Sequence, residues 1–436
     1  MFYFIYNAIL SILWPVYVLC SILMPGLREF RRSRITLDDF PALNPQGAPL
    51  LWLHAASVGE MDQALAVARE FRPLHPKVRI ALSVFSLSVK KLEHSDVDVM
   101  FRLPVDFYWS WAKLLRALKP GAFVTFTWDV FPNLLLHLKK NQTPAFLSCA
   151  ALAADSSRLR FPLRPLMKPV YRKLSGIGVV DQNNLERFQI LASAEDRQQD
   201  QSKANQRSRD WPRVMVTGDS RYDAIFHRIE NAKLSDEIER KLKSSSRNWI
   251  LASTYAACDD VILPHLKAIL DEFRDLNVLV FPHFVDEKRI QSIEAKIREQ
   301  SLSYTRFSDS TPGRICIVDQ LGVLALAYRY AAFAYVGGGF HHRIHNTGEP
   351  AAFALPILTG PRIETSPVAL LLEEKGALSR IDSQTIVDRV RVLMKDDAQR
   401  VATGRRGQQA LQNERGSAKK FVAAFLSAVF AEQPRR

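Results

Sequence analysis

The chain has 436 residues, of which 47% are hydrophobic and 24% charged, so it is neither disordered nor small enough for one ordinary hydrophobic core. The formal net charge of +14 predicts an anionic partner: nucleic acid, an acidic lipid surface or a phosphorylated substrate. Basic residues are spread along the chain without interleaved aromatic residues, so we expect no nucleic acid as a partner. The four cysteines form no C-x-x-C pair, which argues against a disulfide framework or a zinc site.

Residues 1–27 carry no charged side chain and are long enough to cross the ~30 Å hydrocarbon core of a bilayer as a helix. They lack the basic start and the small-residue cleavage site of a signal peptide, so we expect a membrane anchor. Arginines follow at residues 28, 31, 32 and 34, which places the rest of the chain in the cytoplasm by the positive-inside rule. Pro15, with Trp14 and Tyr17 beside it, leaves open an interfacial helix instead of a span, and a buried core helix is a third alternative.

Alternating strand and helix patterns follow in two series. In the first, Pro49–Ala55 is a buried strand that runs into the turn Ser57–Glu60 and the helical pattern Met61–Phe71. Further strands of this series are expected at residues 78–84, 122–126, 145–149, 176–180 and 214–216. Strands of the second series are expected at residues 249–252, 278–281, 315–318, 331–336 and 357–359. This alternation predicts an α/β fold with two doubly wound, Rossmann-like domains.

The pattern also predicts the domain boundaries. We expect a membrane anchor at 1–35, an N-terminal domain at 36–218, a linker at 219–246, a C-terminal domain at 247–412, and a C-terminal helix and tail at 413–436. Ligands bind outside the carboxyl ends of the strands in such sheets, so we expect the two domains to face a shared cleft. The apolar stripe of Lys419–Ala431 predicts a helix that packs on one of the domains, without indicating which.

The stretch Tyr335–Pro361 combines a strand, the triplet Gly337-Gly338-Gly339 and a helix start at Glu349-Pro350. A glycine turn facing a helix N-terminus is a common phosphate site, and a carboxylate beside it can accept hydrogen bonds from a ribose diol. The stretch is therefore interpreted as a nucleotide pocket. The alternative is an ordinary strand-to-helix turn with a capping carboxylate, since the triplet is not a G-x-G-x-x-G fingerprint.

Glu60 follows a glycine turn at the carboxyl end of the first strand, where it is placed to accept a proton from a substrate hydroxyl. A plain charge at a helix N-terminus is the alternative. His341, His342 and His345 are close together, but no carboxylate or cysteine stands at ligand spacing, so we expect no metal. No P-loop, hydrolase elbow or zincin motif occurs.

Two motifs, LHAASVGE at 53–60 and HN-x-x-EPAAFALPILTGP at 345–361, resemble the Kdo transferases of lipopolysaccharide assembly. These enzymes attach 3-deoxy-D-manno-oct-2-ulosonic acid (Kdo) to lipid A precursors. Shorter segments extend the likeness in order: FPN at 131–133, GDSRYD at 218–223, AST at 252–254 and the strand end at Pro282. The resemblance implies an inverting glycosyltransferase of the GT-B fold at the inner membrane of a Gram-negative bacterium. Its N-terminal domain would bind the anionic lipid and its C-terminal domain CMP-Kdo, without a cofactor.

The resemblance also implies roles for individual residues. Glu60 corresponds to the general base, Arg221 to a lysine that stabilises the transition state, and Asp129 is the next candidate base. The residues expected around CMP are Pro282, His283, Gly322, Val323, Leu324, Asn346, Thr347, Gly348 and Glu349. Further contacts with donor or acceptor are expected from Ser57, Gly59, Ser253, Thr254, Gly337, Gly338, Gly339 and His345.

Besides Arg221, this chain departs from the family pattern in three places. The acidic E-T-E-L-W-P-N motif appears as T-W-D-V-F-P-N at 127–133, His283 replaces an arginine, and Tyr255 and Ala256 replace a His-Glu pair. Two other functions therefore stay open: a GT-B enzyme that uses a UDP- or GDP-sugar, and a membrane-attached binding protein that has lost catalysis.

Overall fold

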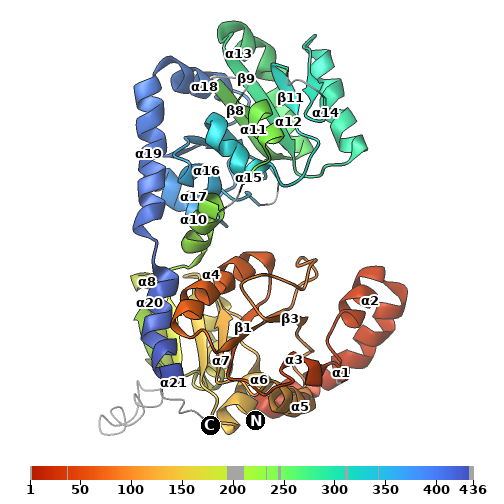
Figure 1. Ribbon diagram of the computed structural model, residues 1–436, viewed down its shortest axis with the longest axis vertical. Coiled ribbons are helices and arrows are strands. Elements are labelled where there is room, and N and C mark those ends of the chain that lie inside the picture. Colours follow the sequence, from red (N-terminus) through yellow and green to blue (C-terminus); the bar gives the residue numbers. More distant parts are fainter. Residues whose placement is uncertain are drawn as a thin grey trace. The chain divides into compact units, whose positions relative to one another are not determined.

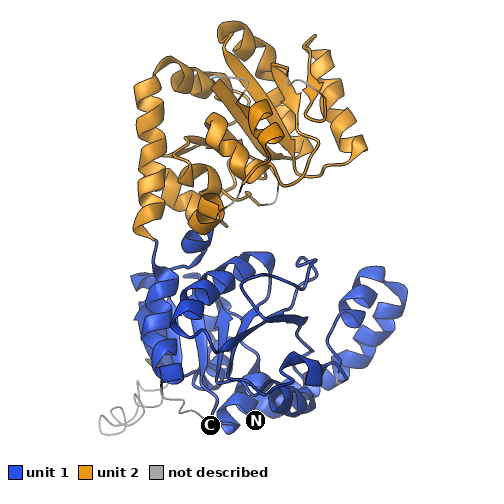
Figure 2. Ribbon diagram, viewed as in Figure 1, with its two compact units in different colours: residues 1–224, 415–436 blue, residues 225–414 orange. Residues whose placement is uncertain are grey.

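The computed structural model describes residues 2–36, 38–193, 211–231, 233–243, 247–309, 313–341 and 343–431. The chain forms two compact units, shown in different colours in Figure 2. Unit 1 comprises residues 1–224 and 415–436, and unit 2 comprises residues 225–414. Each unit contains a seven-stranded, entirely parallel sheet, which confirms the predicted α/β fold (Figure 1).

The sheet of unit 1 has the strand order β3-β2-β1-β4-β5-β6-β7. Its strands are β1 (Leu50–Ala55), β2 (Arg79–Val84), β3 (Val99–Arg102), β4 (Ala122–Phe126), β5 (Ala145–Ala150), β6 (Gly176–Val179) and β7 (Arg213–Val216). Its helices are α1 (Phe2–Leu23), α2 (Pro25–Arg32), α3 (Phe40–Leu43), α4 (Val58–Leu74), α5 (Tyr108–Leu118), α6 (Pro132–Lys140), α7 (Leu163–Tyr171) and α8 (Gln182–Ser193). The order reverses between β1 and β4, so the chain winds outward in both directions from this pair.

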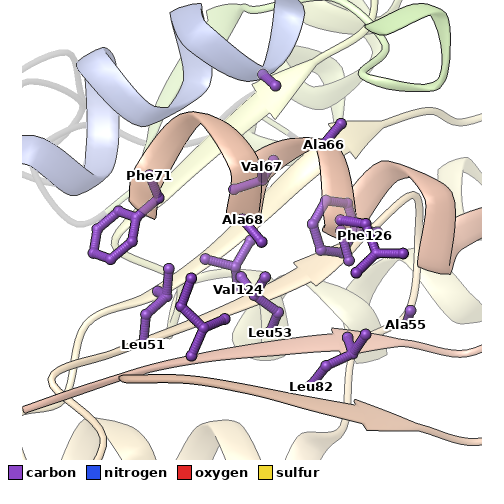
Figure 3. Close-up of a cluster of buried hydrophobic side chains, with 14 of the residues drawn as sticks. Leu51, Leu53, Ala55, Ala66, Val67, Ala68, Phe71, Leu82, Val124 and Phe126 are labelled. Atoms are coloured by element: carbon purple, nitrogen blue, oxygen red, sulfur yellow. The ribbon is translucent and has the colours of Figure 1, made fainter. Parts of the chain in front are cut away.

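Helices cover both faces of this sheet, which explains why every residue of β1 and β5 is buried. On one face, α4 places Ala66, Val67, Ala68 and Phe71 over the strands, where they meet Leu51, Leu53, Ala55, Leu82, Val124 and Phe126 (Figure 3). The opposite face packs against a separate cluster that includes Trp111 of α5 and Leu134 of α6. The first predicted strand, β1, thus lies at the centre of the core.

The C-terminal segment packs on unit 1. It consists of α20 (Ser417–Phe421), a π-helical turn (Val422–Leu426) and α21 (Ser427–Ala431). The Asp223 carboxylate accepts hydrogen bonds from the backbone N–H groups of Gly416 and Ala418, at 2.6 and 2.9 Å. Side chains of this segment also approach β6 closely: a Cβ added at Gly178 would lie 2.8 Å from the Phe421 ring. The structure therefore decides which unit the predicted helix covers.

Unit 2 has the strand order β10-β11-β9-β8-β12-β13-β14. Its strands are β8 (Arg247–Thr254), β9 (Leu276–Pro282), β10 (Thr305–Arg306), β11 (Ile315–Ile317), β12 (Ala331–Val336), β13 (Ile357–Thr359) and β14 (Leu378–Arg380). Its helices are α11 (Asp236–Leu242), α12 (Ala256–Ile262), α13 (Leu266–Glu272), α14 (Glu287–Glu299), α15 (Leu324–Ala327), α16 (Gly348–Ala352), α17 (Pro367–Glu374), α18 (Ile386–Lys395) and α19 (Asp397–Asn413). The helix α10 (Arg221–Asn231) contains the boundary between the units.

Candidate active site

In unit 1 the residues of interest follow the two strands at which the sheet reverses. The strands β1 and β4 pair in parallel, with His54 opposite Thr125. Helix α4 begins at Val58, shortly after β1 and three residues before the predicted Met61, so Gly59 and Glu60 lie in its first turn; the segment from Thr127 to Asp129 follows β4. Ligands of doubly wound sheets bind at this reversal, outside the carboxyl ends of the strands. The sheet thus brings the predicted base and the altered acidic motif to the same edge.

Glu60 stands in the first turn of α4, and its side chain is only 8% exposed. The backbone N–H of Ser57 donates to Glu60 Oε2 at 3.1 Å, so the carboxylate also caps the helix. Gly59, beside it, borders open space, because a Cβ added there would meet no atom within 4 Å. The packing of the protein therefore does not require glycine at this position, and a ligand can approach the backbone.

Burial first, and then the charge of Asp129, raise the pKa of Glu60 to about 7, against hydrogen bonds from Ala56, Ser57 and Thr127 that lower it. Burial also raises the pKa of Asp129, whereas the positive charge of Arg158 lowers it. A carboxyl group with a pKa near neutrality can exchange a proton with a substrate at physiological pH. Sequence reasoning did not identify Arg158.

Thr127 has a left-handed backbone, with φ of 61°, an uncommon conformation for a β-branched residue. Its hydroxyl lies 3.3 Å from Gln63 Oε1, and Gln63 Nε2 donates to Asp219 Oδ1 at 2.7 Å. Asp219 Oδ1 also accepts the backbone N–H of Arg221 at 2.9 Å. This chain of contacts joins the residues after β4 to the predicted transition-state cation, Arg221. Sequence reasoning missed Gln63, although Asp219 belongs to the quoted GDSRYD segment.

In unit 2 the glycine triplet follows β12, which pairs with β8 at the corresponding reversal of the sheet. A Cβ at Gly337 would lie 2.2 Å from the carbonyl oxygen of Ser253, and one at Gly338 would lie 2.1 Å from that of Arg343. A Cβ at Gly339 would lie 2.8 Å from the backbone nitrogen of Gly360. Backbone atoms of unit 2 therefore pack directly against the triplet, and a residue with a Cβ does not fit at these three positions.

Four rings gather near this turn: those of Tyr255, His283, His341 and His345. The Tyr255 ring stacks on His341 and His345, with centroids 4.9 and 5.5 Å apart and interplanar angles of 14°. His283 lies 4.4 Å from His345, and the Tyr255 hydroxyl lies 3.1 Å from His345 Nε2. Tyr255 and His283 are two of the positions at which the chain departs from the family pattern. Both departures therefore fall in one cluster, which the sequence did not predict.

The end of β8 supports this cluster. Ser253 has φ of 51°, and the carbonyl oxygen of Thr254 accepts the backbone N–H of His283 at 3.0 Å. Arg289 donates to the hydroxyl of Thr254 at 3.2 Å and forms an ion pair with the buried Asp259. Ser253 and Thr254 thus lie beside the residue that follows Pro282, the last residue of β9.

The loop Asn346–Glu349 leads into α16. Asn346 Oδ1 accepts the backbone N–H of Gly348 at 2.9 Å, and the Thr347 side chain is buried. Glu349 is 8% exposed and forms an ion pair with Arg228 of α10. Sequence reasoning did not identify Arg228. The Glu349 carboxylate therefore has an ion-pair partner within the protein, in addition to its predicted role of binding the ribose.

The remaining residues predicted around CMP lie at the start of α15. Gly322 adopts φ of 85°, and a Cβ there would meet no atom within 4 Å. Val323 is buried at the N-cap position, and Leu324 begins the helix. Among the described residues, no group of three or more His, Cys, Asp or Glu side chains is arranged to hold a metal ion. His342, one of the histidines considered for a metal, lies outside the described residues.

The described part of the chain contains one helix long and apolar enough to cross a membrane, α1, with a mean hydropathy of 1.8 over its most apolar window. It corresponds to the predicted anchor.

Comparisons with known proteins identify similar sequences and similar structures. Residues 31–204 match the model of a family described as 3-deoxy-D-manno-octulosonic-acid transferase (kdotransferase). The chain is 24% identical to the 3-deoxy-D-manno-octulosonic acid transferase of Haemophilus influenzae, over 97% of both chains. It resembles the structure of UDP-GlcNAc 2-epimerase from Neisseria meningitidis (TM-score 0.61, 11% identity, 87% of this chain and 99% of that one). It also resembles MurG from Acinetobacter baumannii (TM-score 0.51, 11% identity, 86% and 98%).

The two parallel sheets and the likeness to these structures define a protein of the GT-B fold. Within that class, the chain is a glycosyltransferase, similar over nearly its full length to the 3-deoxy-D-manno-octulosonic acid transferase of Haemophilus influenzae.

Proposed function

We propose that this protein transfers Kdo from CMP-Kdo to the anionic lipid A precursor of lipopolysaccharide biosynthesis. The similarity to 3-deoxy-D-manno-octulosonic acid transferases supports the sugar, and the net charge of +14 suits an anionic lipid acceptor. The observation that carries the mechanism is the buried Glu60 carboxyl, whose pKa is raised to about 7 at the reversal of the first sheet.

In this mechanism Glu60 is the general base. Its carboxylate takes the proton of an acceptor hydroxyl, and that oxygen forms a bond to the anomeric carbon of Kdo from the face opposite CMP. The bond from this carbon to the phosphate oxygen breaks, CMP leaves with the electron pair, and the anomeric configuration inverts. Arg221 stabilises the negative charge that develops on the departing phosphate. Asp129 keeps the pKa of Glu60 high and is the alternative base.

The donor side of the proposal uses unit 2. Glu349 accepts hydrogen bonds from the ribose hydroxyls of CMP, and the residues from Asn346 to Gly348 line the nucleotide. The other proposed contacts are Pro282, His283, Gly322, Val323 and Leu324. The ring cluster around His345 adds aromatic faces and N–H groups close to these residues, which suits a pyrimidine nucleotide or its phosphate.

Helix α1 would hold the enzyme at the cytoplasmic face of the inner membrane. The uncharged helix and the arginines that follow it support this location.

Turnover with purified components tests the proposal directly. Full-length protein is incubated with CMP-Kdo and a tetraacylated lipid A precursor in detergent, and the lipid is analysed by mass spectrometry. We expect one or more Kdo additions and release of CMP. Transfer only from a UDP- or GDP-sugar would replace the donor assignment. Binding of CMP without turnover from any of these donors would identify a protein that has lost catalysis.

A further inference from the structure

Helix α1 exposes its most apolar face. Its half-buried face, which points toward the protein, carries hydroxyl, amide and amphipathic ring groups beside apolar side chains such as Leu10 and Val18; the polar and ring groups are those of Tyr3, Tyr6, Asn7, Trp14 and Tyr17, with the buried Ser21. Its outer face is exposed and almost entirely apolar: Phe4, Ile5, Ile9, Ile12, Leu13, Val16, Leu19 and Leu23. Phe4, Ile12 and Leu23 are 79%, 70% and 80% exposed. A contiguous apolar face of this size needs an apolar partner.

The first half of the inner face is hydrogen-bonded to buried groups of unit 1. The Tyr6 hydroxyl donates to Asp106 Oδ2 at 2.9 Å, and Asn7 Nδ2 donates to Asn133 Oδ1 at 3.0 Å. Asp106 and Asn133 are 5% and 0% exposed. The Asp106 carboxylate also accepts the indole N–H of Trp111 at 2.7 Å, so the contact reaches the core of the unit. We call these contacts the polar seam.

The second half of the helix is held by aromatic contacts. The Trp14 ring meets Phe107 edge-on at 5.1 Å, and Phe107 stacks on Trp109 at 4.7 Å. Tyr17 packs against Phe30 of α2, and its hydroxyl donates to the carbonyl oxygen of Leu27 at 3.2 Å. The indole of Trp109 is itself 63% exposed, as is common for tryptophan at a membrane surface.

Cations of unit 1 lie at both ends of α1. Near its N-terminus, the Lys173 ammonium group lies 5.2 Å from the centre of the Tyr3 ring. Near its C-terminus, Arg28 Nε donates to the carbonyl oxygen of Ser21 at 3.3 Å, and Arg31 and Arg32 follow in α2. A helix that crossed the bilayer would carry Tyr3 across the ~30 Å hydrocarbon core, away from Lys173, whereas an in-plane helix keeps both of its ends beside cations of unit 1.

We infer that α1 lies in the plane of the membrane interface, docked on unit 1 through the polar seam, with its apolar outer face inserted into an anionic bilayer. Crossing the bilayer would pull Tyr6 and Asn7 away from Asp106 and Asn133. Each buried polar group left without its partner costs ~1–3 kcal/mol. An in-plane helix keeps every contact and buries its outer face ~5–10 Å deep in the interface.

The polar seam also reaches the segment that carries the proposed alternative base. Asn133 belongs to α6, which begins at Pro132, shortly after Asp129. The polar seam thus ties the inserted helix to the segment that carries the altered acidic motif. The choice of an anionic bilayer rests on the proposed function, whereas the orientation of α1 rests on the contacts alone.

Depth-dependent fluorescence quenching tests the orientation. Single cysteines replace Ile5, Ile12 and Leu19 in full-length protein with Cys20→Ser, because the other three cysteines are buried. Each carries an environment-sensitive fluorophore and is mixed with vesicles of phosphatidylcholine and phosphatidylglycerol containing lipids brominated at known depths. We expect the same shallow depth for all three positions, and little quenching for Leu10→Cys on the inner face. A deep Ile12 between shallow Ile5 and Leu19 would show a spanning helix and overturn the inference.

Vesicle flotation supplies the second measurement. The triple variant Ile9→Glu, Ile12→Glu, Val16→Glu should bind these vesicles at least tenfold more weakly, with CMP affinity and melting temperature unchanged. Equal binding by this variant and the wild type would also overturn the inference. Turnover on detergent-dispersed acceptor, measured in parallel, does not depend on vesicle binding. Loss of that turnover in the wild type contradicts the proposed function and leaves the orientation of α1 to the quenching result.

Discussion

Glu60 and Asp129 follow two adjacent parallel strands, β1 and β4, and Glu60 has a pKa of about 7 because of its burial and the charge of Asp129. The relationship between the two carboxyls makes the protonation state of the proposed base sensitive to pH near neutrality. It also provides the first two predictions.

Activity should rise with pH along an acidic limb centred near pH 7, because only the deprotonated Glu60 can accept the acceptor proton. Glu60→Gln should lose ~10²–10⁴ in turnover, the usual contribution of a positioned base, and any residual activity should lack this limb. Calorimetric titration with CMP serves as the control and should be unchanged, since Glu60 belongs to unit 1 and the proposed nucleotide residues to unit 2. Full turnover with the wild-type pH profile would exclude Glu60 as the base.

The same pKa predicts a pH-dependent stability. The folded state binds the Glu60 proton more tightly than the unfolded state, because the folded pKa lies above the ordinary value of 4.5. This contribution is fully present below about pH 4.5 and is lost as the pH rises through about 7. Glu60→Gln removes the ionisation, so urea unfolding should show the variant gaining stability relative to the wild type between pH 5 and pH 8.

Asp129→Asn should shift the acidic limb of activity to lower pH, because it removes the charge that helps to raise the pKa of Glu60.

Glu349→Gln should weaken CMP binding about tenfold or more, because it replaces charge-assisted hydrogen bonds to the ribose with neutral ones. Its melting temperature should change little, since the Arg228 partner is 40% exposed and such an ion pair contributes ~0–1 kcal/mol. Arg228→Gln is the matched control, because it removes the same ion pair and leaves the carboxylate. If both variants lose CMP affinity equally, Glu349 acts only through Arg228.

Two glycine substitutions should differ in their effect on stability. Gly59→Ala meets no atom within 4 Å and lies in the first turn of α4, so the protein should fold with unchanged stability. Its kcat/KM should nevertheless fall if a substrate uses the space beside Glu60. Gly337→Ala places a Cβ 2.2 Å from the Ser253 carbonyl oxygen and should lower the unfolding free energy by ~1–3 kcal/mol. Unchanged kcat/KM for Gly59→Ala would show that no substrate approaches this position.

The ring cluster should make the protein sensitive to acid. Burial lowers the pKa of His345 to about 4, and the charges of His283 and Arg343 contribute in the same direction. As the pH falls from about 6.5 toward 4, the unfolded state takes up a proton that the folded state does not, so stability falls. His345→Asn should flatten the pH dependence of urea unfolding in this range. Tyr255→Phe, which removes the hydroxyl 3.1 Å from His345 Nε2, should preserve that dependence while lowering stability at pH 7 by ~0.5–1.5 kcal/mol.

Local sequence signals predicted the central strands of both sheets and where those strands end, but not the edge strands β3, β10 and β14. Pro49–Ala55 predicts β1 because both faces of a central parallel strand are buried, so its residues form a nearly continuous apolar run. The pattern after it predicts a helix from Met61, whereas α4 begins three residues earlier, at Val58, where the Glu60 carboxylate accepts the backbone N–H of Ser57. Glu60 could therefore be placed at the edge of the sheet without coordinates.

The tertiary structure decided the contacts between residues distant in the sequence. Helical periodicity showed that residues 419–431 have an apolar face, but only the close approach of Phe421 to Gly178 assigns them to unit 1. An apolar N-terminus is compatible with a membrane-spanning or an interfacial helix, and the contact of Asn7 with Asn133 favours the interfacial helix. The ring cluster and the links from Gln63 to Thr127 and Asp219 likewise join separate segments. Hydrophobic patterns report which residues are buried, because burial depends on local periodicity. The partner of a buried polar group depends on the packing of the whole unit.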